Sequence, residues 1–498
     1  MTSPAVTARW RDLVSPALAP RAALVVLGVW LNAADALVTA TIMPSVAHDL
    51  GGAAYYGWAV AFYLTGSIMA GASTGQLSHR LGLRPAMVIA ALAYAGGCLL
   101  SAASPTIELF LLGRVLQGVG AGWLVGFCYV AIGMVFPEGL WARMFGATAA
   151  VWGIASILGP FIGGVFAAAG HWRGAFWMFA GQGGLFAVAC MLLLPARRAE
   201  GLDIRPLAWR TLTALAAAIL VIAAADVIGG VAAPAALLAL GVALLAVAAW
   251  INAAPGERLL PPEAANPASV AGAGYAMIFA MEVATVVINV YEAAVLQTVY
   301  RVSPLIAGYA VSVMAVGWTA AAFLVANQPE RRHGGFIIAG ATIIVAGCAL
   351  MALAIAHWPL GWIVAAGAII GVGFGLSWSL ATGRILRALP ENDRAIGSAA
   401  VPTTQLIGGA VGAAAAGAVA NLLGLAQAFT PAHARADAPW LFGVFVPVAA
   451  LGLWAAVRLG RGSAVPAEPL THQAIESKRQ AGAPIPPSGD FPQRGKRN

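Results

Sequence analysis

Charged residues are scarce in this chain. Only 9% of its 498 residues are charged, whereas about a quarter of the residues in soluble globular chains are. Hydrophobic residues make up 61%, and the mean hydropathy is +0.85. A soluble protein of this length would need more charge to cover its surface. The composition therefore excludes a soluble globular protein.

Cysteine is equally scarce, and the common signatures of metal sites and enzymes are missing. The four cysteines are far apart, lie in apolar runs and form no CxxC: Cys98, Cys128, Cys190 and Cys348. We expect them to serve packing. The sequence contains no HExxH, GxSxG or P-loop, and its loops are too short to house a catalytic domain. We therefore expect no metal, no cofactor and no enzymatic activity.

Apolar runs of roughly twenty residues repeat along the chain, which is the length a helix needs to cross a bilayer. We predict an all-α polytopic membrane protein surrounded by lipid. The first run has no cleavage site after a short apolar region, so we expect it to remain as a helix. The fourteen predicted spans are 22–46, 55–77, 86–103, 107–133, 144–168, 174–195, 207–228, 232–252, 268–295, 304–326, 335–356, 359–382, 396–424 and 438–458.

Arginine and lysine are distributed very unevenly between the two sides of these spans. With the N-terminus in the cytoplasm, 23 of the 27 basic residues are cytoplasmic, and only Arg173, Arg301 and Arg435 lie on the opposite side. This asymmetry predicts that both termini are cytoplasmic. It also explains the net charge of +8 without a nucleic-acid partner. We expect a disordered, solvated tail over 461–498, with contact to anionic lipid as the alternative.

A polar, basic stretch at residues 75–85, GQLSHRLGLRP, lies between two apolar runs. It resembles the cytoplasmic loop of the major facilitator superfamily, Gly-x-Leu-x-Asp-Arg-x-Gly-x-Arg. A generic basic loop is the alternative, although five matches at fixed spacing disfavour it. The matching residues are Gly75, Leu77, Arg80, Gly82 and Arg84.

His79 stands where that family has an aspartate. The resemblance implies that this aspartate joins a charge network that latches the cytoplasmic side. Histidine cannot supply the negative charge. We therefore expect a weaker or differently built latch, with pH sensitivity near the imidazole pKa.

The fourth span contains LGRVLQGVGAG, which resembles the family's Arg-x-x-Gln-Gly-x-Gly motif through Arg114, Gln117, Gly118 and Gly120. Inserting an arginine into a span costs roughly 2.5–3.5 kcal/mol on translocon scales. We expect Arg114 to face a cavity or an acid and to perturb a proton-binding carboxyl group. A structural ion pair is the alternative.

The fifth span carries GIASILGPFIGG. Small residues at four-residue spacing favour close helix packing, and a proline favours a kink. In the resembled family, this Gly-Pro-x-x-Gly-Gly element is characteristic of exporters of the antiport type. The residues concerned are Gly159, Pro160, Gly163 and Gly164.

Asp35 is the only acid of the first span, and helical spacing places Asn32 and Thr39 on its face. An intramembrane carboxylate is a functional candidate; an N-cap or bundle contact is the alternative. The family's element here is Asp-x-Thr with a proline nine residues after the acid. Pro44 matches this element, whereas Leu37 replaces the threonine.

The ninth span carries a polar stripe at spacings of three, four and three residues: Glu282, Thr285, Asn289 and Glu292. We expect it to line a central cavity, because a lipid-facing stripe would be unstable. Asp226 in the seventh span is a weaker candidate, since it stands alone.

The resemblance covers about residues 22–458 and, with the span count, indicates the fourteen-helix drug:proton antiporter family. Span thirteen contributes Gly397, Gln405 and Gly408 to it. It implies two six-helix halves with two inserted helices between them. The expected divisions are a cytoplasmic segment at 1–21, the halves at 22–196 and 266–460, the inserted helices at 197–265 and the tail at 461–498.

The resemblance implies a bacterial plasma-membrane exporter, functional as a monomer, that exchanges small amphipathic or cationic compounds for protons by alternating access. We expect Asp35 to carry the proton, Arg114 to modulate it, and Glu282 with Glu292 to form a second proton or cation site. The residues expected around the substrate are Asn32, Tyr63, Gln117, Thr285, Asn289 and Gln405.

Five aromatic side chains could face a cationic substrate, although packing or interface anchoring is the simpler explanation for each: Trp58, Tyr63, Trp123, Trp152 and Trp318. A proton-coupled importer of a small nutrient or metabolite is the alternative function, and the Gly-Pro element in span five argues against it. A membrane sensor or enzyme is a more distant alternative. The substrate itself does not follow from the sequence.

Overall fold

The computed structural model describes residues 10–51, 55–194, 207–225, 232–254, 258–325, 328–390, 394–425 and 429–462. Within these ranges every regular element is a helix. The bilayer favours this outcome because a helix satisfies its backbone hydrogen bonds within its own segment. The described residues form one compact unit that ends at Gly462. The expected all-α architecture is confirmed there.

The first eight long helices are α2 (Ala19–Leu50), α3 (Tyr56–Leu81), α4 (Leu83–Ala102), α5 (Ile107–Val135), α6 (Glu138–Ala168), α7 (Trp172–Leu193), α8 (Trp209–Ala224) and α9 (Ala232–Ala253), preceded by the short α1 (Trp10–Leu13). The remaining elements are η2 (Pro262–Ala265), α10 (Val270–Val287), η3 (Ile288–Glu292), α11 (Ala293–Val299), α12 (Pro304–Val325), η4 (Glu330–Arg332), α13 (His333–Ala354), α14 (Leu360–Ala388), α15 (Arg394–Leu422), α16 (Pro431–Gly443) and α17 (Val446–Arg461).

Each of the fourteen predicted spans overlaps a helix or a consecutive run of helices. Twelve of these in the described chain are long and apolar enough to cross a membrane, counting α10–α11 and α16–α17 as one each. The other two are α3 and α8; α8 is apolar but has only 16 residues. The predicted span at 207–228 is therefore shorter in the structure. Asp226 and the tail from 463 lie outside the described residues.

One local prediction was wrong, and two of the predicted spans are less regular than a single straight helix. The loop expected between spans two and three is almost entirely helical: α3 runs to Leu81, and α4 starts at Leu83. Only Gly82 separates them, with φ 84° and ψ 158°, a backbone conformation essentially restricted to glycine. The ninth span is interrupted by the π-helical turn η3. The last span is divided into α16 and α17, where Pro447 in the first turn of α17 lacks a backbone donor.

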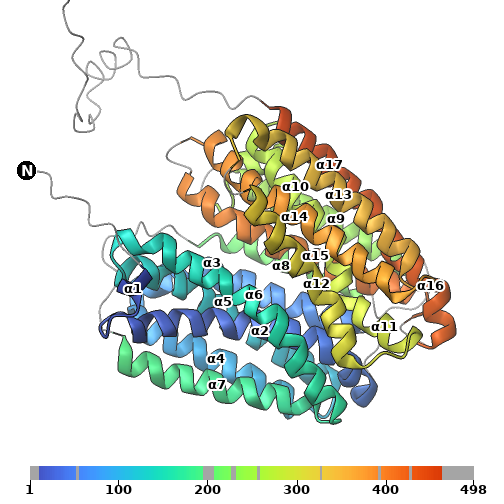
Figure 1. Cartoon of the computed structure of the whole chain (residues 1–498), viewed down its shortest axis with the longest axis horizontal. Coiled ribbons are helices and arrows are strands. Elements are labelled where there is room, and N and C mark those ends of the chain that lie inside the picture. The colour runs from blue at the N-terminus through green and yellow to red at the C-terminus, as the bar shows by residue number, and fades with distance from the viewer. Residues whose placement is uncertain are drawn as a thin grey trace, which may run out of the picture. The chain divides into compact units, whose positions relative to one another are not determined.

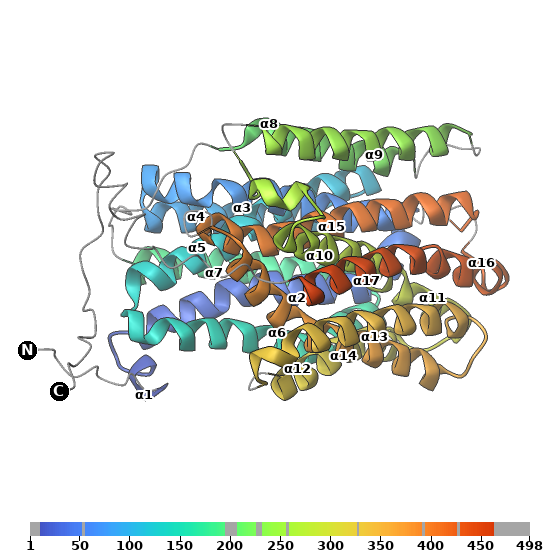
Figure 2. The same cartoon turned by 90° about the horizontal axis from the view of Figure 1, so that it is seen from above.

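The helices pack in two groups, which Figure 1 shows as blue-to-teal and yellow-to-red ribbons. We call α2–α7 the N-terminal group and α10–α17 the C-terminal group. The groups contact each other mainly through α6 with α12 and through α3 with α15. Helices α8 and α9 lie side by side at one edge in Figure 2, and α8 packs on both α15 and α3. The predicted division into two halves and an inserted pair remains a prediction about domain boundaries.

Successive long helices run in opposite directions, so each end of the bundle collects alternate connections. We call the end where α2 finishes the Gly51 end and the opposite one the Gly82 end. By this alternation, the Gly51 end also holds the starts of α12 and α16. There Tyr300, just before α12, donates its hydroxyl to the carbonyl of Trp358, between α13 and α14, at 2.7 Å. At this end, the ring of Tyr56 in α3 stacks on that of Phe429, just before α16.

Close backbone approach within the N-terminal group depends on glycines of α4 and α5. A β-carbon on Gly118 would collide with the carbonyl oxygen of Tyr63 in α3. One on Gly97 of α4 would collide with the backbone nitrogen of Gln117 in α5. Small residues at such positions let membrane helices pack backbone to backbone. These glycines therefore set the distances between α3, α4 and α5.

Gly96 and Gly97 provide a matched test of this packing. Gly97→Ala is expected to lower stability by about 1–3 kcal/mol, as overpacking does, because backbone atoms of α5 cannot move away. Gly96→Ala should leave stability unchanged or slightly higher, since only the Leu116 side chain lies nearby, at 3.8 Å. Thermal unfolding of the two purified variants in detergent measures the difference. Equal melting temperatures would contradict this account of the α4–α5 contact.

Candidate functional site

Three polar side chains from α2 and α5 form a closed hydrogen-bonded network in the N-terminal group. Arg114 Nη1 lies 3.2 Å from Asp35 Oδ2 and donates to Gln117 Oε1 at 2.8 Å. Gln117 Nε2 donates to Asp35 Oδ1 at 2.8 Å. The relative exposures of Asp35, Gln117 and Arg114 are 0%, 0% and 2%. The pair is thus sealed from solvent, and each charge is compensated by the other.

Helical spacing explains why these residues meet. Arg114 and Gln117 are three positions apart on α5 and so share a face. On α2, Thr39 lies one turn after Asp35 and donates its hydroxyl to Asp35 Oδ1 at 3.3 Å. Asp35 therefore accepts hydrogen bonds from three side chains. The sequence interpretation of Arg114 as a residue that needs an acid agrees with this arrangement.

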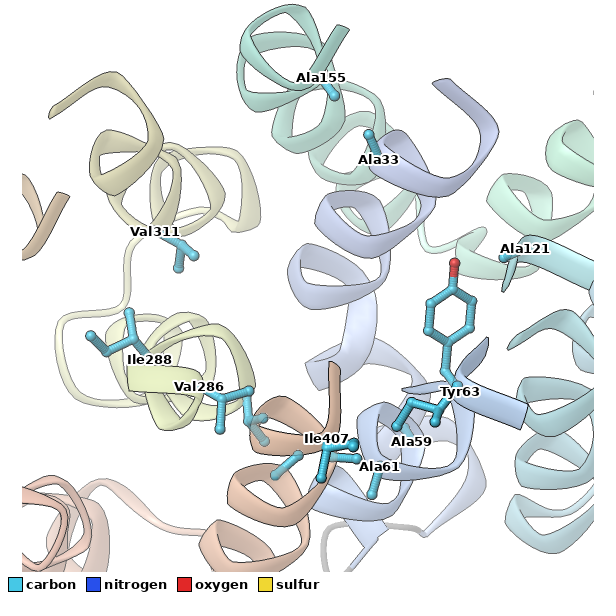
Figure 3. Close-up of a cluster of buried hydrophobic side chains, with 14 of the residues drawn as sticks. Ala33, Ala59, Ala61, Tyr63, Ala121, Ala155, Val286, Ile288, Val311 and Ile407 are labelled. Carbon is cyan, nitrogen blue, oxygen red and sulfur yellow. The ribbon is translucent and has the colours of Figure 1, made fainter. Parts of the chain in front are cut away.

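Tyr63 of α3 completes the surroundings of the arginine. The Arg114 guanidinium carbon lies 4.3 Å from the centre of the Tyr63 ring, a cation–π distance. The same guanidinium donates through Nε to the carbonyl of Ala59 at 3.3 Å. The Tyr63 hydroxyl donates to Asn32 Oδ1 at 2.7 Å. Figure 3 shows this side chain among the small buried residues of the centre, with its hydroxyl directed away from Ala59 and Ala61.

The arrangement suits reversible protonation of one carboxyl group. Deprotonated Asp35 is held by a fixed cation and two neutral donors. Protonation would neutralise Asp35, and the Arg114 charge would then be stabilised only by Tyr63, Gln117 and the Ala59 carbonyl. A proton on Asp35 would therefore change the forces between α2 and α5, which is what coupling to a conformational change requires.

The glycine–proline motif of α6 faces two different helices. A β-carbon on Gly159 would lie 2.7 Å from the Cβ of Leu37 in α2. One on Gly163 would lie 2.9 Å from the Cβ of Thr41 in the same helix. A β-carbon on Gly164 would lie 2.8 Å from the Leu305 Cα of α12. Pro160 faces Gly308 of α12, where an added β-carbon would lie 2.8 Å from the proline Cβ. The motif thus joins α6 to its own group on one face and to the C-terminal group on the other.

In the C-terminal group, Glu282 of α10 has one weak partner. Gln405 Nε2 of α15 lies 3.5 Å from Glu282 Oε2, at the limit of a hydrogen bond. Thr285 is buried and donates to the Met281 carbonyl of its own helix at 2.9 Å. Asn289 is partly exposed. The structure therefore brings Glu282 and Gln405 together, whereas Thr285 is satisfied locally.

Glu292 is the last residue of the π turn η3, and its side chain is completely buried. Neither of its carboxyl oxygens has a hydrogen-bond partner among the described residues. The sequence placed Glu292 on one regular stripe with Glu282. The π turn η3 interrupts the regular helical spacing between them, and the cavity-lining stripe stays a prediction. The two acids differ in surroundings as well as in position.

The motif between α3 and α4 is described only in part. Gly82 forms the corner, Arg80 is exposed and Arg84 is partly buried. The side chains of Gly75 and His79 lie outside what the structure describes, so the expected role of His79 stays a prediction.

Most of the aromatic candidates make ordinary packing contacts. Trp123 donates to Ser73 Oγ at 2.8 Å, and Trp58 packs on Phe62 with ring centres 4.9 Å apart. Trp318 stacks on Phe374 at 4.8 Å. Trp152 is 46% exposed. Tyr63 differs from the other four in its contact with the Arg114 guanidinium.

Sequence reasoning missed two features at the Gly51 end. Tyr56 of the N-terminal group inserts between Tyr291 and Phe429 of the C-terminal group, with ring centres 5.6 and 6.2 Å apart. The π turn that carries Tyr291 was also unforeseen. The aromatic residues flanking spans two and nine were a usable signal, but nothing in the spacing pairs them. No group of three metal-ligating side chains occurs in the described ranges.

Comparisons with known proteins give a consistent result. The family model described as Major Facilitator Superfamily matches residues 25–326. A probable multidrug-efflux transporter of Mycobacterium tuberculosis is 30% identical over 439 residues, which cover 83% of this chain and 90% of that protein. A transporter of the acurin A biosynthesis cluster of Aspergillus aculeatus is 26% identical over 417 residues, which cover 79% of this chain and 74% of that protein.

Solved structures show the same fold. The crystal structure of a D-xylose-proton symporter aligns with a TM-score of 0.63 at 19% identity, over 90% of this chain and 99% of that one. A mutant of the nucleoside transporter NupG aligns with a TM-score of 0.62 at 12% identity, over 88% of this chain and 98% of that one. The expected major facilitator fold is therefore confirmed.

The buried pair predicts a non-additive response to substitution. Asp35→Leu or Arg114→Met alone should cost about 3–5 kcal/mol, because each leaves an uncompensated buried charge. The double variant should recover most of that loss. Melting temperatures of the four proteins in detergent give the coupling energy.

The exposed pair Glu330–Arg387, also 3.2 Å apart, is the control. Glu330→Leu should change stability by at most about 1 kcal/mol. Additive losses for Asp35 and Arg114 would show that the two side chains do not depend on each other.

Proposed function

We propose that this chain, which belongs to the major facilitator superfamily, exports small amphipathic or cationic compounds in exchange for protons. Family and fold make it a multi-pass membrane transporter rather than an enzyme. The multidrug-efflux designation of its mycobacterial relative supports export as the direction. Proton exchange and the substrate class are part of the proposal.

The observation that carries the proposal is the sealed network of Asp35, Arg114 and Gln117. A coupling residue must hold a proton in one conformation and release it in another. Asp35 lies between two opposing influences, since burial disfavours its charge and Arg114 favours it. A small change in either influence would alter its protonation. Asp35 is therefore the proposed proton carrier, and Arg114 its modulator.

The contacts between the two groups support alternating access. Helices α6 and α12 meet through Gly164 and Gly308, and α3 meets α15 where a β-carbon on Gly57 would collide with the Ala413 carbonyl. These close approaches lie toward the Gly51 end, which is closed in this structure. Rocking of the groups would separate them there and expose the centre to the other side.

The substrate would bind between the groups, near the network. The residues proposed to surround it are Asn32, Tyr63, Gln117, Thr285, Asn289 and Gln405. Glu282, which has a long contact with Gln405, is the proposed second site for a proton or a cationic substrate, and Glu292 is a separate proposed proton-binding group. The apolar residues where α15 meets α3, such as Ile407 and Ala61 in Figure 3, suit an amphipathic compound.

The arginine distribution supports a cytoplasmic Gly82 end and an outward-facing Gly51 end. Both termini are then cytoplasmic. We place the protein in the bacterial plasma membrane, given its mycobacterial relative, and propose that it acts as a monomer.

Import of a small nutrient by proton symport is the second candidate, because a close structural neighbour is a D-xylose-proton symporter. Inverted membrane vesicles decide between the two. Export predicts that an imposed gradient, acidic in the vesicle lumen, drives uptake of a cationic dye into inverted vesicles. Symport predicts that the same gradient drives the transported compound out of the lumen.

Asp35→Asn should abolish proton-driven transport in proteoliposomes, because an amide cannot take up and release a proton at this site. Binding of the compound should persist. Asp49→Asn, on the same helix but at the surface and paired with Arg173, is the matched control and should keep transport. Undiminished proton-coupled transport by Asp35→Asn would rule out the proposed carrier.

A further inference from the structure

The ring of Tyr56 joins the two helix groups at the Gly51 end. It belongs to the first turn of α3, and it lies between two rings of the C-terminal group, Tyr291 in η3 and Phe429 before α16. The interplanar angles are 18° and 10°, so all three rings are stacked. Tyr56 and Tyr291 are 5% and 2% exposed. This three-ring stack closes the seam between the groups.

Glu292 is bonded directly to one member of the stack, Tyr291, within the same π turn. Its side chain has an exposure of 0%, and both carboxyl oxygens are buried without a hydrogen-bond partner. A charged carboxylate that is buried without a protein partner carries a large free-energy cost. The closed Gly51 end therefore requires Glu292 to be neutral.

The elements around the π turn offer no charge to offset an ionised Glu292. Helices α3, α10, α11 and α12 pack against η3. Neither α11 nor α12 contains a charged residue. On α10 the only one is Glu282, ten positions away, and on α3 the basic residues His79 and Arg80 lie at the opposite end. Toward this end, α3 and α12 present the tyrosines Tyr56 and Tyr309 rather than arginine, lysine or histidine.

The π turn η3 is a local departure from regular helix geometry. Such turns insert an extra residue into a helix and often occur at functional sites. Here the turn separates α10 from α11 and carries both the stack residue and the unpartnered acid. A shift in this turn would separate Tyr291 from Tyr56 and, at the same time, admit water to Glu292.

We propose that Glu292 is a protonation-dependent lock on the outward-facing end: neutral Glu292 permits the stack to close, and its ionisation opens it. This deepens the proposed antiport function and rests on the orientation given there. Glu292 lies seven residues before the end of α11, about 10 Å from it at 1.5 Å per residue. Its proton would exchange with the outer side only. The lock therefore responds to external pH and is distinct from Asp35, whose proton is carried across.

The test measures closure directly and needs no substrate or gradient. Ala103 of the N-terminal group and His357 of the C-terminal group are both exposed at the Gly51 end. Spin labels on cysteines at these positions report the separation of the groups by pulsed electron resonance. The four native cysteines are buried and do not compete for label. The protein is reconstituted in nanodiscs and examined from acidic to alkaline pH.

The parent protein should shift toward longer distances as pH rises. One linked proton changes the ratio of open to closed by up to about tenfold per pH unit. Glu292→Gln, which mimics the neutral acid, should keep the short distance throughout. Glu292→Leu should behave in the same way if glutamine is not tolerated. The proposal is overturned if either folded variant opens with pH as the parent does.

Two further variants separate this lock from proton coupling. Tyr56→Ala added to Glu292→Gln should restore long distances, now independent of pH, because the stack is weakened and no charge remains to respond. Asp35→Asn should lose coupled transport yet retain the pH-dependent opening. Loss of the opening in Asp35→Asn would contradict a separate lock. If the parent protein opens with pH but does not transport, the proposed antiport function is wrong and the lock stands.

Discussion

A charge inside a membrane bundle must find a partner, and the N-terminal group is arranged around that requirement. Arg114 reaches Asp35, Gln117, the Tyr63 ring and the Ala59 carbonyl only because α5 packs very close to α3 and α2. That proximity in turn depends on glycine at Gly118 and Gly97, where a β-carbon would meet backbone. Charge compensation in this group therefore depends on its small-residue packing.

The C-terminal group treats its acids differently. Glu282 has a single long contact with Gln405, and Glu292 has no partner in the described part of the chain. No arginine or lysine occurs between residues 270 and 299. An acid beside a fixed cation can cycle between two compensated states, whereas an isolated buried acid has to be neutral until water reaches it. This asymmetry is the physical basis of the two proposals, that Asp35 carries the proton and that Glu292 controls closure of one end.

Much of the fold and part of the site could be predicted from residue patterns. Apolar runs located the spans because the bilayer accepts only segments that satisfy their own backbone. The cost of Arg114 within a span predicted a cavity or an acid near it. The hydrogen bonds of Gln117 to Arg114 and Asp35 were not predicted. The glycines and proline of α6 predicted close packing, and Gly163 and Gly164 do approach α2 and α12. The π turn could not be predicted, because nothing in INVYE distinguishes it from a regular helical turn.

By itself, the sequence determined the helical membrane class, the order of the spans and the polar residues available within them. These follow from hydropathy and from periodicity along a single segment, which are local properties. Only the tertiary structure decided which acid is compensated and which is left alone. It also decided that Tyr56 enters between Tyr291 and Phe429, residues more than two hundred positions away. Such pairings depend on how helices from the two groups meet, and no local pattern encodes that meeting.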